Sequence, residues 1–310
     1  MLLSKNKLKQ IFLVLFLSMG AYYCSAQQQA MYSQYLINGL AINPAYAGSR
    51  ETLSGVVGYR KQWVGLNGAP STFNLGIHSP IKKKNIALGV NITGDEIGIT
   101  KTTGVFLSGS YKIKLNKGSL RFGLQGVFTN YTQNWSEINT IDEGDNAFNL
   151  ADESYFLQNF GTGLYWQSEK YFAGISIPLI LSQDHGAKEN GVVLSSVRHY
   201  FMHAGTLIDL NKELKLKPSV MLKYVEGAPM QFDLNGMVIL NNAFWIGASY
   251  RSMDGISLST QFHTKKFLWF GYAYDFPLTD LNRVTTGSHE IFIGIDYYKI
   301  KSRILSPRYF

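Results

Sequence analysis

The chain has 310 residues, enough for one large domain or two ordinary ones. Charged residues make up 16% of it, well below the roughly 25% of soluble domains, while Tyr and Phe number 19 each and Gly 30. The formal net charge is +8, but the basic residues are spread over predicted turns and strands. This argues against nucleic-acid binding, which needs a clustered basic surface. The composition suits a sheet with one face in lipid, and equally a secreted β-sandwich.

The first 26 residues have the pattern of a secretory signal peptide. Three lysines within residues 5–9 precede the apolar run 11–17, and the small residues Ser25–Ala26 follow. Removal of residues 1–26 would lower the net charge to +5 and take away Cys24, the one cysteine of the chain. A lipoprotein, with lipid attached to Cys24, is the alternative, but the bulky pair Tyr22–Tyr23 before it disfavours lipoprotein processing.

Residues 27–51 do not alternate between polar and apolar positions. The stretch 34–48 is apolar and aromatic, and Asn43–Pro44 interrupts any helix. We interpret 27–51 as an N-terminal arm that packs against or inside the main domain. More specifically, it would be a periplasmic docking segment or a plug.

From Thr52 onward the chain alternates with the period of two that places successive side chains on opposite faces of a sheet. Strands are predicted near residues 52–60, 71–79, 85–93, 103–114, 119–130, 156–168, 170–177, 198–209, 214–225, 230–241, 243–251, 255–264, 267–276 and 288–299. Their number, about fourteen, is even, as in bacterial single-chain outer-membrane barrels. Residues 300–310 remain as a C-terminal tail.

The hairpin Thr103–Asn130 is the clearest of these strand pairs. Its strands have about ten residues or more, and a tilted strand needs about 9–11 residues to cross a bilayer. Lipid offers no hydrogen bonds, so the spanning strands have to close into a barrel. The sequence therefore predicts an all-β fold, a transmembrane outer-membrane β-barrel over residues 52–299.

The connections differ in length between the two ends of the predicted strands. The predicted short turns lie at 80–84, 115–118, 169, 210–213, 242 and 265–266. The predicted loops at the other end lie at 61–70, 94–102, 131–155, 178–197 and 277–287, with shorter ones at 226–229 and 252–254. Short periplasmic turns and longer outer loops are typical of outer-membrane barrels, which predicts that both termini are periplasmic.

Charge placement predicts which face of the strands lines the lumen. Lys215, Lys217 and Lys223 share one parity, and a lysine facing lipid costs about 2–4 kcal/mol at the bilayer midplane. We therefore expect these three lysines to point into the lumen, and we expect the same of Lys112. The same parity holds for Arg121, Gln125, Gln231, Asp233, Asn235, Gln261 and His263. Pro218 removes a ladder hydrogen bond and suggests a bulge.

No pattern in the chain indicates an enzyme. His78 and Ser79 lie on opposite faces of one strand, and no nucleophile-elbow, phosphate-loop or zinc-hydrolase motif is present. His199, His203 and His263 are interpreted as polar groups of the lumen. The acidic residues within 142–153 could bind calcium or form a solvated loop. We expect no catalytic residue, no cofactor and no metal site.

The arm and the first hairpin carry a family resemblance. The residues that carry it are Ser33–Gln34–Tyr35, Asn38, Leu40 to Ser49, Tyr59–Arg60–Lys61–Gln62–Trp63, Gly68 to Thr72 and Pro307 to Phe310. Together with the signal peptide and the barrel, they resemble the PorP/SprF family of Bacteroidetes outer-membrane proteins. The resemblance covers essentially the whole mature chain, although its specific motifs lie mainly before residue 80.

The resemblance implies a role in the type IX secretion system and, in some members, in gliding motility. It implies a barrel that supports secretion or surface attachment of a cargo adhesin with a C-terminal targeting domain. The expected partners are this adhesin, a periplasmic peptidoglycan-binding lipoprotein or the secretion ring, and outer-membrane lipid. The alternative function is a porin or diffusion channel for small solutes.

Partner contacts are expected at the arm and at the outer loops. The expected residues are Leu40, Asn43, Pro44, Tyr46, Gly48, Lys61, Trp63 and Trp135. The loops 131–155 and 178–197 are expected to contribute to the outer contact, and the exposed lysines 82–84 could meet an acidic periplasmic partner.

Overall fold

The computed structural model describes residues 35, 37–137, 151–185, 194–264, 266–297 and 309–310. The predicted signal peptide and most of the acidic loop lie outside the described residues. The main strands are β1 (Leu53–Lys61), β2 (Ser71–Pro80), β3 (Ile86–Ile97), β4 (Thr100–Leu115), β5 (Gly118–Gln133), β6 (Glu153–Gln167), β7 (Tyr171–Ile177), β10 (His199–Thr206), β12 (Leu214–Val225), β13 (Gln231–Leu240), β14 (Phe244–Arg251), β15 (Gly255–His263), β16 (Leu268–Pro277) and β17 (Ser288–Tyr297).

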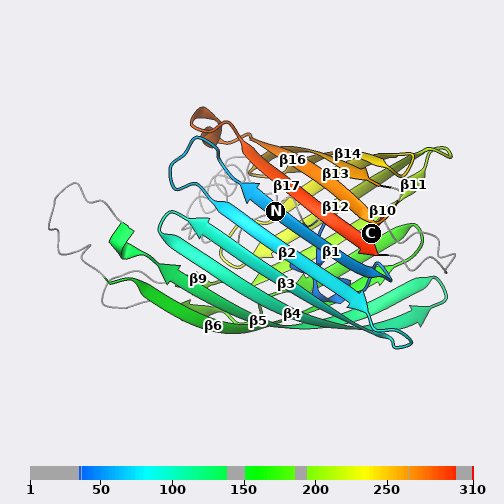
Figure 1. The fold of residues 1–310 in the computed structure, drawn as a ribbon, viewed down its shortest axis with the longest axis horizontal. Helices are drawn as coiled ribbons and strands as arrows, with labels where there is room; N and C mark the ends of the chain where they lie inside the picture. Colours follow the sequence, from blue (N-terminus) through cyan, green and yellow to red (C-terminus); the bar gives the residue numbers. More distant parts are fainter. Residues whose placement is uncertain (1–34, 36, 138–150, 186–193, 265, 298–308) are drawn as a thin grey trace, which may run out of the picture.

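These fourteen strands form one closed antiparallel barrel (Figure 1). Each pairs with its neighbours in sequence, β1 pairs with β17, and β10 pairs with β12, so that the ring has no open edge. The two-residue strand β11 (Ile208–Asp209) also pairs with β12, and β8 (Gln183–His185) and β9 (Leu194–Ser196) form a separate ribbon. The predicted barrel of about fourteen strands is confirmed.

The hairpin β4–β5 is the longest pair in the barrel. Both strands have 16 residues, and the ladder runs without a break from Thr100 opposite Gln133 to Leu115 opposite Gly118. In a bilayer this continuous pairing satisfies the backbone N–H and C=O groups, which lipid cannot do.

The predicted long loop at 94–102 is wrong. β3 and β4 continue through this region and meet at a tight turn, where Gly98 has a φ of +56°. Asp95 pairs with Thr102, and Lys101 lies 3.7 Å from Glu96 across the ladder. The polar residues of this stretch predict a loop, but a strand that extends past the lipid layer can carry polar side chains on both faces.

The bulge predicted at Pro218 is also wrong. The pairing of β12 with β13 runs through Pro218, opposite Gly236, without an extra residue. On its other side, β10 and β11 pair with β12 in one register. Pro218 has no N–H to donate, and it lies beside the interruption between β10 and β11. The residue in that interruption, Leu207, donates its N–H to Lys170 O.

The two faces of the barrel wall have opposite chemistry. On β5, Leu124 is 70% exposed on the outside, whereas Arg121 is 2% exposed on the inside. The same alternation buries Lys217 and Lys223. Other residues predicted for the lumen are also buried there, namely Gln125, His199, His203, Asp233, Asn235, Gln261 and His263. The predicted assignment of faces is confirmed, because the apolar face is the one that meets lipid.

The two ends of the barrel differ in their connections. We call the end with residues 81–85, 116–117, 168–170, 207–213, 241–243 and 264–267 the short-turn end, and the opposite end the long-loop end. β1 begins and β17 finishes at the short-turn end. No helix among the described residues has the length and apolarity needed to cross a membrane.

A charge on the outer face should weaken insertion in proportion to its depth. Leu124→Lys, at the middle of β5, is expected to lower the folding free energy in phospholipid vesicles by about 2–4 kcal/mol. Leu115→Lys, at the end of β4 beside the turn, is the matched control and should cost less. Urea titration of folding into vesicles measures both. Equal costs at the two positions would contradict the placement of β5 across the lipid.

Candidate functional site

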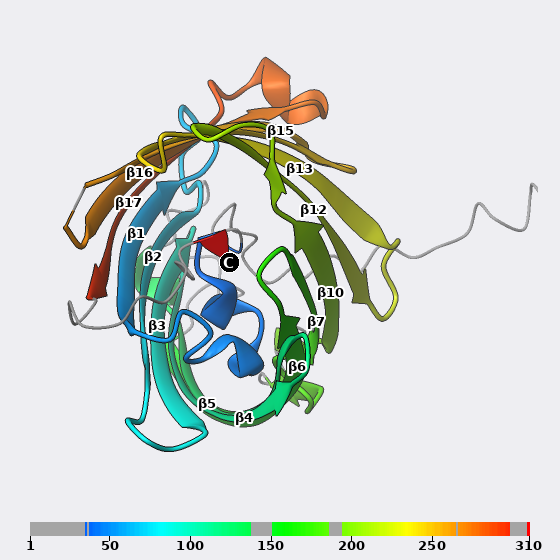
Figure 2. The same cartoon turned by 90° about the vertical axis from the view of Figure 1, so that its right-hand side faces the viewer.

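The N-terminal arm lies inside the barrel. Figure 2 looks into the barrel from the short-turn end and shows the arm, in blue, enclosed by the strands. It forms two short 3₁₀ helices, η2 (Gly39–Ala41) and η3 (Pro44–Tyr46). Asn43 caps η3 by accepting the Ala45 N–H at 2.9 Å, and Pro44 suits the first helical position because it needs no N–H partner.

Asparagines attach the arm to one wall of the lumen. Asn38 Nδ2 donates to Asn74 Oδ1 on β2 at 2.8 Å and to Asn91 Oδ1 on β3 at 3.1 Å. Asn74 Nδ2 in turn donates to Asn91 Oδ1 at 3.1 Å. All three side chains are buried, so each hydrogen bond replaces a lost contact with water.

A second set of hydrogen bonds attaches the arm to the opposite wall. Asn43 Nδ2 donates to Leu164 O on β6 at 2.9 Å, and Ser176 Oγ on β7 donates to Ile42 O at 2.7 Å. The arm therefore crosses the lumen between β2–β3 and β6–β7.

Where the arm returns toward β1, wall side chains bind its backbone. Ser110 Oγ donates to Ala47 O and Arg121 Nη2 to Gly48 O, both at 2.7 Å. The Gly48 N–H donates to His78 Nδ1 at 3.1 Å. Gly48 has a φ of +71°, and a Cβ there would lie 2.3 Å from the Cβ of Ala87, so this position requires glycine.

Ion pairs secure the last two residues of the arm. Arg50 pairs with Asp296 on β17 at 2.9 Å, with both side chains buried. Glu51 accepts from Lys112 and from Arg121, both at 2.6 Å. The predicted inward orientation of Lys112 and Arg121 is confirmed. Removal of one partner from a buried ion pair costs about 3–5 kcal/mol, so the Arg50–Asp296 pair holds the arm firmly. The Glu51 side chain is 31% exposed, so its pairs contribute less.

The wall is shaped to admit the arm. A Cβ at Gly123 on β5 would lie 2.1 Å from Ala45 N, and a Cβ at Gly163 on β6 would lie 2.2 Å from Asn43 Oδ1. Neither separation is possible for real atoms, so the arm fits because these two wall positions have no side chain.

The five arm residues predicted to bind a partner all lie in the lumen. Leu40, Asn43, Pro44, Tyr46 and Gly48 are buried, and the Tyr46 ring packs edge-on against the rings of His78 and Tyr165, each at 5.4 Å. In this arrangement they contact the barrel wall. A contact of these residues with a partner stays a prediction.

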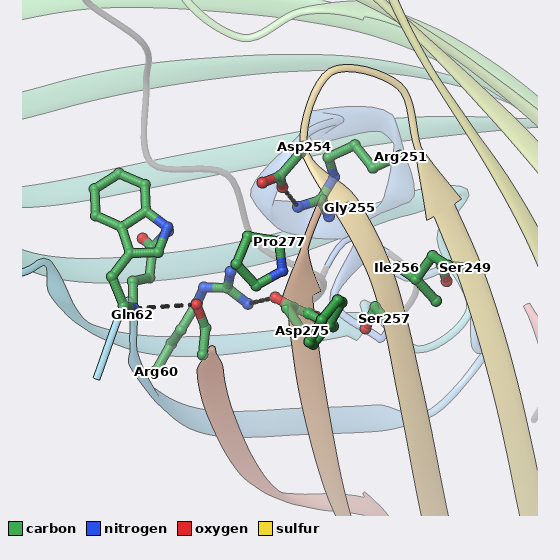
Figure 3. Close-up of a pocket in the computed structure, with 13 residues that line it drawn as sticks. Arg60, Gln62, Ser249, Arg251, Asp254, Gly255, Ile256, Ser257, Asp275 and Pro277 are labelled. Atoms are coloured by element: carbon green, nitrogen blue, oxygen red, sulfur yellow. Dashed lines mark hydrogen bonds and ion pairs between the residues drawn. The ribbon is translucent and has the colours of Figure 1, made fainter. Parts of the chain in front are cut away.

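A polar pocket lies at the long-loop end of the lumen (Figure 3). Arg60 pairs with Asp275, and it pairs with Glu290 at 3.1 Å. Arg251 pairs with Asp254 at 2.8 Å and with Asp233 at 3.4 Å. Arg60, Arg251, Asp254 and Asp275 line this pocket, which we call the mouth. Glu290 and Asp233 pair with the same two arginines.

The other predicted contact residues lie at the long-loop end. Trp63 lines the mouth, where its backbone N–H donates to Ser288 Oγ at 3.2 Å. Lys61 ends β1 beside it, with its Nζ 3.4 Å from Ala69 O. Trp135 begins a 3₁₀ turn, η4 (Trp135–Glu137), on the connection after β5.

Sequence reasoning did not find the charged residues of the mouth. Arg60 and Asp275 are separated by more than 200 residues, and only the closure of the ring brings β1 and β16 to the two sides of β17. The available signal was that both have lumen parity near the ends of their strands at the same end of the barrel.

Only the edge of the predicted acidic loop is described. Asp152 accepts from the N–H and the hydroxyl of Ser136, each at 3.0 Å, and these bonds lower the pKa of its carboxyl. Asp142, Glu143 and Asp145 lie outside the described residues. Among the residues that are described, no group of three or more His, Cys, Asp or Glu side chains is placed to hold a metal ion.

Comparison with protein families identifies the family of this barrel. The model of the type IX secretion system membrane protein PorP/SprF matches residues 24–295. The chain belongs to the PorP/SprF family. This PorP/SprF protein is thus a membrane component of the type IX secretion system, and its barrel lies in the outer membrane. A search of curated proteins found no match.

Solved structures resemble the PorP/SprF barrel at low sequence identity. The outer-membrane protein Omp33 of Acinetobacter baumannii is 8% identical, with a TM-score of 0.47 over 80% of this chain and 100% of that chain. The CymD monoaromatic hydrocarbon channel is 13% identical, with a TM-score of 0.49 over 84% and 93%. The P. putida toluene transporter TodX is 9% identical, with a TM-score of 0.48 over 84% and 94%.

Adding one methyl group to the wall should displace the arm. Gly123→Ala is expected to push η3 out of place, because the new Cβ would overlap the backbone of Ala45. Gly109→Ala on β4, where a Cβ meets nothing within 4 Å, is the matched control. Limited proteolysis of the detergent-solubilised barrel should cleave the arm in the first variant only. Equal resistance of both variants would contradict the packing of Ala45 against β5.

Proposed function

We propose that this barrel is a non-enzymatic anchor for a secreted adhesin that bears a C-terminal targeting domain. The observation that carries the proposal is the arm held across the lumen. Hydrogen bonds to β2, β3, β4, β6 and β7 and the Arg50–Asp296 pair make it part of the folded barrel. A barrel closed in this way serves better to hold a partner than to pass a solute.

The orientation that supports this function places the short-turn end, and with it both termini, in the periplasm. The long-loop end then faces the cell exterior, as in outer-membrane barrels generally. The adhesin would meet the mouth, and a peptidoglycan-binding lipoprotein or the secretion ring would meet the short turns. The turn after β2 suits such a partner, since Lys82, Lys83 and Lys84 are all exposed there.

The mouth offers chemistry suited to holding a protein segment. Trp63 supplies a large amphipathic ring, the kind of group that dominates binding energy at interfaces. In the same pocket, Arg60 and Arg251 are already paired with carboxylates, so the mouth is preorganised and its charges need no new counter-ions. Lys61 and Trp135 would extend the contact over the rim.

Deletion of the arm distinguishes the anchor hypothesis from the diffusion-channel hypothesis. A chain lacking residues 27–49 should still form a heat-modifiable barrel, should gain conductance in planar bilayers, and should fail to support secretion of the adhesin. The intact chain should show no open conductance. Open conductance of the intact chain, with no secretion component recovered from native membranes, would favour the channel. Unchanged secretion after the deletion would reject a role for the arm.

Cargo binding at the mouth can be tested with a double variant. Trp63→Ala combined with Lys61→Ala should reduce adhesin recovery in a pull-down from native membranes by at least about tenfold, the loss expected when 1.4 kcal/mol of binding is removed. Tyr59→Ala, on the lipid face of the same strand, is the control and should recover the adhesin normally. Equal recovery with the double variant and the control would place the contact elsewhere.

A further inference from the structure

One cation of the lumen is buried without an anion. Lys217 on β12 is 8% exposed, and no carboxylate of the described chain pairs with it. Its Nζ instead lies 5.5 Å from the centre of the Phe172 ring and 5.6 Å from that of Phe310.

Three buried arginines of the lumen are each paired with a carboxylate. Arg50 pairs with Asp296 at 2.9 Å, Arg121 with Glu51 at 2.6 Å and Arg251 with Asp254 at 2.8 Å. Burial of an unpaired ammonium is strongly unfavourable, and contacts with two aromatic rings offset only part of that cost. An anion beside Lys217 would supply the missing compensation.

A small cavity lies next to Lys217, on the inner face of β12 to β15. It is lined by Lys217, Ser219, Asn235, Met237, Ser249 and Ser259, together with backbone of β13 and β14. The cavity is small, with room for one water-sized species. No side chain of Asp or Glu lines it among the described residues.

The polar groups of this cavity are available to a ligand. The hydroxyls of Ser219, Ser249 and Ser259 have no side-chain hydrogen bond within the described chain, and each can donate one proton. Asn235 donates to Tyr35 Oη at 2.8 Å, whereas its Oδ1 has no hydrogen-bond partner among the described atoms. A serine hydroxyl or the Lys217 ammonium can direct a proton to that oxygen and still leave several donors.

We propose that Lys217 and the hydroxyls of Ser219, Ser249 and Ser259 bind one halide-sized anion in the lumen. The site supplies one positive charge and three neutral donors and has room for a single monatomic ion. Chloride is a monatomic ion with the complementary charge. The ion would neutralise Lys217 and so stabilise the closed barrel around its arm.

Stability in different salts tests the proposal on the full chain in detergent. The midpoint of the heat-induced gel shift is measured in sodium chloride, sodium bromide and sodium methanesulfonate at one ionic strength. The midpoint should be higher in both halides and should rise with the logarithm of halide concentration above the dissociation constant. Lys217→Met should remove this dependence. Lys215→Met is the matched control, since Lys215 pairs with Asp209 at 3.0 Å, and it should keep the dependence.

Equal midpoints of the unmodified chain in all three salts would overturn the proposal, as would a full halide response in Lys217→Met. Bromide diffraction gives a second measurement that does not depend on how the variants fold. Crystals of the unmodified chain in sodium bromide should show an anomalous peak within contact of Lys217 Nζ and the serine hydroxyls. A well-ordered cavity without that peak would mean that water fills it, and the proposal would be wrong.

Discussion

The constraint on which this structure depends is that lipid cannot hydrogen-bond to a peptide group. Every strand that crosses the bilayer has to pair on both sides, and fourteen strands satisfy this by closing β1 on β17 and β10 on β12. Closure also separates two environments. The outward positions, such as Leu124, meet lipid, and the inward ones, such as Arg121, meet whatever fills the lumen. The polar lumen is thus a direct consequence of the closed sheet.

The arm provides hydrogen-bond partners for the polar groups that closure of the barrel encloses in the lumen. A lumen lined by buried Asn, Ser, Arg and Asp side chains needs hydrogen-bond partners, and the arm supplies them from its own backbone and side chains. Ser110 and Ser176 bind arm carbonyls, and Asn74 and Asn91 bind Asn38. The glycines at 123 and 163 make room for this contact. Arm and wall therefore form one folded unit, since each satisfies groups that the other would leave unpaired.

The two ends of this unit have different chemistry. The long-loop end carries the mouth, which is lined by Trp63 and by the paired Arg60 and Arg251. The short-turn end carries exposed lysines on tight turns. Membership in the PorP/SprF family makes this barrel a membrane component of the type IX secretion system.

The sequence by itself determined the number of strands, the inward and outward faces and the existence of a separate arm. Positions that face lipid are apolar and positions that face the lumen are polar, so the sequence of each strand alternates with a period of two. The same pattern wrongly predicts a loop at residues 94–102, where the structure has paired strands. Strands that extend beyond the lipid lose the apolar half of the pattern. Only the tertiary structure decided where the arm lies, which carboxylates neutralise Arg60, and that Phe172 and Phe310 flank Lys217. These contacts join residues far apart in the chain, and closure of the barrel alone sets the distances between them.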